Sequence, residues 1–65
     1  MAPNNPTRLL RLRDVIDATG VPRSTIYAWV ASGEFPRPRR LGPRAVAWRS
    51  DEIHSWIESR DKASA

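Results

Sequence analysis

The sequence predicts a small, mainly α-helical domain that carries one β-hairpin. Apolar residues recur with helical spacing in three segments, and a short alternating segment lies between the second and the third. A chain of 65 residues without cysteine leaves room for one domain with a small core and no disulfide or cysteine-bound zinc. Large apolar side chains must stabilise that core, so we expect Trp29, Trp48 and Trp56 to be mostly buried.

The first helix is predicted at residues 12–19, after an N-terminal arm. Residues 1–7 contain two prolines and no periodicity, so we expect this arm to be disordered. Asp14 near the helix start and Gly20 just after its end are suitable terminal residues. The helix places four residues in one stripe, namely Leu12, Val15, Ile16 and Thr19.

The second helix is predicted at residues 23–32, because Pro22 suits a helix entrance and Gly33 suits the left-handed position after the last turn. Its apolar face consists of Ile26, Trp29 and Val30. Only residues 20–22 separate the two helices. Two short amphipathic helices joined by a tight glycine-containing turn are typical of a helix-turn-helix.

A connector, a hairpin and a third helix complete the prediction. The prolines of residues 34–38 exclude a helix there, and Phe35 is expected to anchor the connector in the core. Residues 39–49 are predicted to form a two-stranded hairpin, with Val46 and Trp48 on its inward face. Ser50 is a suitable cap for a helix at about 51–60, and residues 61–65 are expected to fray.

Positive charge is concentrated in the middle of the chain. The net charge of +4 divides into +1 for residues 1–22, +5 for residues 23–49 and −2 for residues 50–65. Ten of the eleven cationic residues are arginine. The codons of a GC-rich genome would also favour arginine over lysine, but such a bias would enrich arginine along the whole chain and does not explain the clustering. The clustering is typical of a surface that binds a polyanion.

Catalytic and metal-binding chemistry is not indicated. His54 is the one histidine, and a surface position on a helix is its simpler interpretation. Asp51 and Glu52 are adjacent, so their side chains would point about 100° apart on a helix. We expect no enzyme activity, metal, cofactor or small-molecule ligand. The apolar run at residues 45–48 is too short to span a membrane, and we expect a cytoplasmic protein.

The predicted second helix carries candidate DNA contacts away from its apolar face. Short polar side chains and an arginine near a helix N-terminus can reach base edges or phosphates. Ser24 and Thr25 have the alternative role of helix-start residues, and Tyr27 that of an aromatic residue at the edge of the core. The candidates are Arg23, Ser24, Thr25, Tyr27 and Ala28.

The hairpin region carries the second group of candidates. The stretch from residue 37 to residue 50 has five arginines and no acid, and like charges held together destabilise a small fold unless a partner neutralises them. A solvated charged face is the simpler alternative, and Arg49 can also pair with Asp51 or Glu52. The candidates are Arg37, Arg39, Arg40, Arg44 and Arg49.

Three motifs follow one another along the chain, namely Arg-Ser-Thr-Ile-Tyr at 23–27, Gly-x-Phe-Pro-x-Pro at 33–38 and Ala-Trp-Arg at 47–49. In this order they resemble the AlpA-like prophage regulators, a group that belongs with phage excisionases and the DNA-binding domain of MerR-type regulators. The resemblance covers about residues 8–60, which we expect to be the DNA-binding domain.

The resemblance implies a winged helix-turn-helix, in which the second helix enters the major groove and the hairpin is the wing. By position, Arg23, Ser24, Thr25 and Tyr27 match recognition-helix contacts, and Arg39, Arg40 and Arg44 match wing positions. Pro22 departs from the pattern, because the family usually has a capping Ser or Thr there.

Two functions within this family, and one outside it, are compatible with the sequence. The first is an excisionase that binds and bends attachment-site DNA, with an integrase and further copies of itself as partners. The brevity of the chain favours it, because no effector domain or long dimerisation helix is present. The alternative is an AlpA-like regulator of prophage genes. Both act on double-stranded DNA in the nucleoid of a bacterial host. A protein-interaction module that binds an acidic partner is the third.

Overall fold

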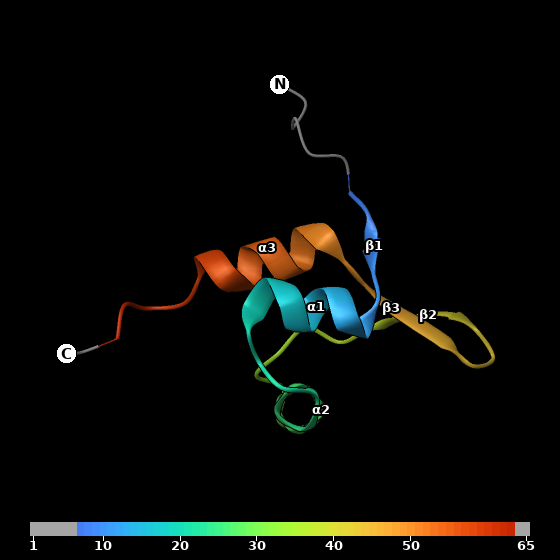
Figure 1. Cartoon of the computed structure of the whole chain (residues 1–65), viewed down its shortest axis with the longest axis horizontal. Coiled ribbons are helices and arrows are strands. Elements are labelled where there is room, and N and C mark those ends of the chain that lie inside the picture. Colours follow the sequence, from blue (N-terminus) through green and yellow to red (C-terminus); the bar gives the residue numbers. More distant parts are fainter. Residues whose placement is uncertain (1–6, 64–65) are drawn as a thin grey trace.

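The structure is a computed structural model that describes residues 7–63. It confirms a mainly α-helical fold with a small β-sheet (Figure 1). Residues 1–6 of the expected arm and residues 64–65 of the expected tail lie outside the described residues. The elements in chain order are β1 (Leu9–Leu10), α1 (Leu12–Thr19), α2 (Arg23–Ser32), β2 (Arg39–Gly42), β3 (Ala45–Arg49) and α3 (Ser50–Glu58).

Helix α1 has the predicted limits because its own residues stabilise both ends. The backbone N–H of Arg11 donates to Asp14 Oδ2 at 3.0 Å, which stabilises the first turn. At the other end, Gly20 has the left-handed φ of +74°, and its N–H donates to the carbonyl of Ile16 at 2.7 Å. Thr19 Oγ1 donates to the carbonyl of Val15 and accepts from the N–H of Val21, so it ties the turn to the helix.

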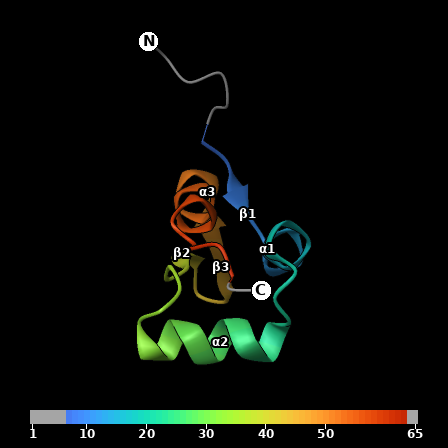
Figure 2. The same cartoon turned by 90° about the vertical axis from the view of Figure 1, so that its left-hand side faces the viewer.

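Helix α2 also matches its predicted limits. Pro22 precedes the first helical residue, and its carbonyl accepts the N–H of Ile26 at 2.9 Å. Gly33 ends the helix with a φ of +82°. Figure 2 shows α2 lying across α1 and α3, both of which are viewed nearly end-on. The pair α1 and α2 therefore has the crossed arrangement of a helix-turn-helix.

The sheet contains the predicted hairpin and one strand that the sequence did not predict. Strands β2 and β3 are antiparallel, with Arg39 opposite Ala47 and an irregularity between Arg40 and Gly42. Strand β1 pairs with the other side of β3, which gives the order β1-β3-β2. Because β1 has only two residues, it has no alternating pattern by which it could be recognised.

The sequence prediction for the start of α3 was wrong in one detail. Ser50 is the first residue of the helix, and Arg49 occupies the position before it. The Ser50 hydroxyl accepts the N–H of Arg8 at 2.7 Å, and the Ser50 N–H donates to the Arg8 carbonyl at 2.7 Å. Ser50 thus fastens the N-terminal segment to the β3–α3 junction. The helix ends at Glu58, two residues before the predicted limit of about 60.

Each major part of the chain contributes one side chain to the buried core. Val15 comes from α1, Ile26 from α2, Phe35 from the connector, Trp48 from β3 and Ile53 from α3. All five are at most 4% exposed, so this cluster holds the two crossed helices, the sheet and α3 together. The expected anchoring by Phe35 is therefore confirmed.

The tryptophans and the hairpin residues differ in burial from the sequence prediction. Trp48 is fully buried, whereas Trp29 and Trp56 pack against the core from its margin and are partly exposed. Val46 was expected to face inward with Trp48, but it is 38% exposed, because the hairpin extends beyond the core. Ala47, on the other face of the strand, is fully buried.

A comparison of two tryptophan substitutions tests the central role of Trp48. Its indole Nε1 donates to the carbonyl of Pro36 at 2.8 Å inside the fold, whereas Trp56 Nε1 donates to the exposed Glu34 carbonyl at 2.9 Å. We expect Trp48→Phe to lower the free energy of unfolding by about 2–3 kcal/mol, because it removes buried surface and leaves a carbonyl without a partner.

Trp56→Phe removes a similar hydrogen bond, but water can reach the Glu34 carbonyl that is left behind. We therefore expect the free energy of unfolding to fall by about 1 kcal/mol. Urea titrations monitored by circular dichroism measure both values. Equal losses for the two variants would contradict the assignment of Trp48 as the central core residue.

Candidate nucleic-acid interface

Helix α2 exposes most of the residues that the sequence selected as DNA contacts. Four of them are exposed, namely Arg23, Ser24, Tyr27 and Ala28, while Thr25 is half-buried. Tyr27 has 45% of its surface exposed, and its hydroxyl makes no hydrogen bond within residues 7–63. Tyr27 is therefore accessible to a ligand. The sequence did not select Ala31, which is also exposed and lies one turn beyond Tyr27.

The N-terminus of α2 has no side-chain cap. Pro22 offers no capping oxygen, and no acidic residue lies in the first turn. The first N–H groups of the helix and the positive end of its dipole therefore face outward beside Arg23. This end of α2 favours a negatively charged group such as a phosphate.

The arginines of the hairpin region fall into two groups by their partners. Arg39 Nη2 lies 2.6 Å from Glu52 Oε2, and Arg49 makes two bonds to the carboxylate of Asp51, at 2.8 and 3.1 Å. The expectation that Arg49 pairs with Asp51 or Glu52 is therefore confirmed for Asp51. The other three arginines of this region, Arg37, Arg40 and Arg44, have no acidic partner within 4 Å in residues 7–63, and all three are exposed.

Strand geometry explains why neighbouring arginines differ. Successive side chains of a strand point to opposite faces of the sheet. Arg39 points to the face where α3 presents Glu52, and Arg40 points to the other face. Nothing in the sequence indicated the Arg39–Glu52 pair, because thirteen residues separate the two and only the folded sheet brings them together.

The two candidate surfaces are separate parts of the molecule. Figure 1 shows α2 end-on below the other helices, while the β2–β3 hairpin projects sideways in the plane of the view. In Figure 2 the orientations are exchanged, with α2 in the plane. The candidates therefore do not gather in one pocket. A helix and a projecting hairpin present them on two adjoining surfaces, as an extended ligand requires.

The acidic residues and the histidine form no catalytic group in residues 7–63. Asp51 and Glu52 pair with separate arginines, and His54 is exposed on α3. No cluster of three potential metal ligands occurs in this part of the chain. None of its helices is long and apolar enough to cross a membrane.

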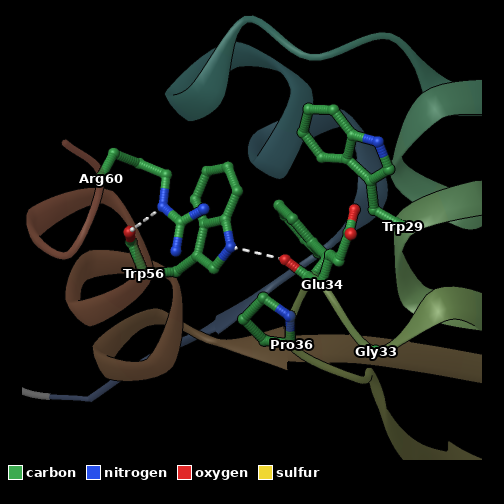
Figure 3. A pocket seen from close by; sticks show the side chains of 7 residues that line it. Trp29, Gly33, Glu34, Pro36, Trp56 and Arg60 are labelled. Carbon is green, nitrogen blue, oxygen red and sulfur yellow. Dashed lines mark hydrogen bonds between the residues drawn. The ribbon is translucent and has the colours of Figure 1, made fainter. Parts of the chain in front are cut away.

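An open aromatic groove of about 620 Å³ lies between the end of α2 and α3. Figure 3 shows Trp56 at its centre, with its indole N–H donating to the Glu34 carbonyl. The Arg60 guanidinium lies 4.6 Å from the Trp56 ring, and its Nε donates to the Trp56 carbonyl at 3.2 Å.

The crossed helices, the tight turn and the projecting hairpin define a winged helix-turn-helix protein with an exposed second helix and a cationic hairpin region. The family model described as "Prophage CP4-57 regulatory protein (AlpA)" matches residues 8–61. The chain belongs to this family. The resemblance noted from the sequence is therefore confirmed, although the relation to MerR-type regulators stays a prediction.

Two relatives are similar over most of the chain. The chain is 41% identical over 61 residues to "DNA-binding transcriptional activator AlpA" of Escherichia coli (strain K12), with 85% of this chain and 87% of the relative covered. It is 42% identical over 53 residues to "Uncharacterized protein ORF88" of Enterobacteria phage P4. That match covers 82% of this chain and 60% of the phage protein.

Proposed function

We propose that this protein is a DNA-binding transcriptional regulator of prophage genes. The observation that carries the proposal is the combination of an uncapped, exposed recognition helix with a hairpin region in which three of the five arginines have no acidic partner in residues 7–63. The similarity to a DNA-binding transcriptional activator over 87% of that protein supports it. On this proposal, residues 8–60 are the DNA-binding unit, and the protein acts on the nucleoid in the cytoplasm of a bacterial host.

The two surfaces have different tasks in this proposal. Helix α2 enters the major groove, where Arg23 and Ser24 reach base edges or phosphates and Tyr27 and Ala28 contact bases. Thr25 is half-buried at the edge of this contact. The hairpin lies against the backbone or in the adjacent minor groove and contacts it through three unpaired arginines, Arg37, Arg40 and Arg44. Arg39 and Arg49 are already paired with acids and mainly fix the hairpin relative to α3.

An excisionase role is the second candidate, although the sequence analysis placed it first. The family description and the bacterial relative both name a regulator, so they favour the alternative. The similarity to a phage P4 protein and the cationic hairpin support the second candidate, because bending DNA requires contacts with its backbone. An integrase and further copies of this chain on adjacent sites would be its partners.

Salt dependence distinguishes DNA binding from the binding of an acidic protein surface. Arg37, Arg40 and Arg44 provide three cations for phosphates, while Arg23 is assigned to a base. We expect the logarithm of the association constant for a duplex to fall linearly with the logarithm of salt concentration, with a slope of about −2.7. Fluorescence anisotropy with labelled duplex DNA measures it. Absent duplex binding at low salt would favour the protein-interaction alternative.

Arg23→Ala and Arg44→Ala separate base recognition from backbone contact. We expect Arg23→Ala to weaken binding to a selected site more than binding to unrelated DNA, because it removes a base contact. Arg44→Ala should weaken both alike and reduce the salt slope by about 0.9. Lys62→Ala removes the same charge outside both surfaces and serves as the control. Equal specific and non-specific losses in both variants would contradict this division.

DNA bending and excision test the second candidate. An excisionase should bend a duplex that contains an attachment site and raise the yield of excision by the cognate integrase. Circular permutation gels measure the bend, and a recombination assay measures the yield. An unbent duplex together with an unchanged yield would leave the regulator as the sole DNA-binding role.

A further inference from the structure

Beyond its first turn, helix α2 exposes no charged or amide side chain. A surface helix normally places charged and polar residues toward solvent. In α2, three of the exposed positions are Tyr27, Ala28 and Ala31, and the helix contains no Asn, Gln, Asp, Glu or Lys. The hydroxyl of the exposed Ser32 donates to the Trp29 carbonyl of its own helix.

These three residues form one continuous patch. Positions 27 and 31, four apart, and positions 28 and 31, three apart, are neighbours on a helix surface. Arg23 lies one turn before Tyr27 on the same side. The outer face therefore consists of Arg23 and Ser24 near the N-terminus, followed by a tyrosine ring and two methyl groups. Small alanine side chains also let the helix backbone approach a ligand closely.

The chemistry of this face selects among the four bases. In the major groove, adenine is read by Asn or Gln, cytosine by Asp or Glu, and guanine by Arg or Lys, whereas Ser and Thr, such as Ser24 here, bond to several bases and select none of them strongly. The thymine C5-methyl group is read by apolar contacts such as alanine or an aromatic ring. On the basis of the proposed DNA-binding function, we infer that α2 reads thymine methyl groups through Tyr27, Ala28 and Ala31, with Arg23 available for a guanine.

The spacing of the contacts follows from helix geometry. One helical turn advances about 5.4 Å, and successive base pairs are about 3.4 Å apart. The guanine and the first thymine should therefore lie about one to two base pairs apart.

The loss of the contact with one thymine methyl group should weaken DNA binding about fourfold, as expected for exposure of one methyl-sized apolar group.

Enrichment of a random duplex library on the full chain identifies a binding site. Each thymine of the enriched duplex is then replaced by deoxyuridine, which lacks only the C5-methyl group. We expect one to three thymines beside a guanine at which this change weakens binding about fourfold, and others at which it has no effect. In the Tyr27→Ala variant, the ratio of the affinities for thymine and uracil at the position that Tyr27 contacts should fall to about one. The Ser32→Ala variant should retain the fourfold ratio at that position.

The outcomes separate this inference from the proposed function. An enriched site without thymine near guanine, or one that tolerates uracil everywhere, would overturn the inference and leave DNA binding intact. An unchanged thymine to uracil ratio at every position in the folded Tyr27→Ala protein would remove Tyr27 from the reading of methyl groups. Failure to enrich any duplex would overturn the proposed function itself.

Discussion

The rest of the structure depends on the burial of one side chain, Trp48, in the central strand of the sheet. Its ring fills the core, and its indole N–H holds the Pro36 carbonyl of the connector. Strand β3 pairs with β1 on one side and β2 on the other, and it continues into α3 without a loop. Because Trp48 is the largest fully buried side chain, the positions of the hairpin, the connector and the third helix all follow from this strand.

Local signals explain how much of the fold the sequence could predict. Helices α1 and α2 have their predicted limits, because Gly20, Pro22 and Gly33 determine where they begin and end. Features that depend on residues far apart in the chain were missed or misread. The hydroxyl of Ser50 bonds to Arg8, forty-two residues away, and strand β1 exists only because β3 pairs with it.

The candidate site shows the same division. Exposure of the α2 residues could be predicted, because their positions follow from helical periodicity. The sequence could not predict which hairpin arginines pair with acids, since the Arg39–Glu52 bond depends on how the sheet packs beside α3. Exposed ion pairs contribute only about 0–1 kcal/mol to stability. The acids of α3 matter more for the direction in which Arg39 and Arg49 point.

The order of the sheet has a consequence for self-association. Strand β2 is an edge strand, and such an edge offers unpaired backbone groups to any other chain. Here Arg39 and Arg40 lie on the edge, and Pro38 and Pro43 stand immediately beyond its ends. Charged side chains and prolines at these places are what natural sheets use to prevent edge-to-edge pairing. The residues that give the hairpin its charge thereby also protect a small, marginally stable domain from aggregation.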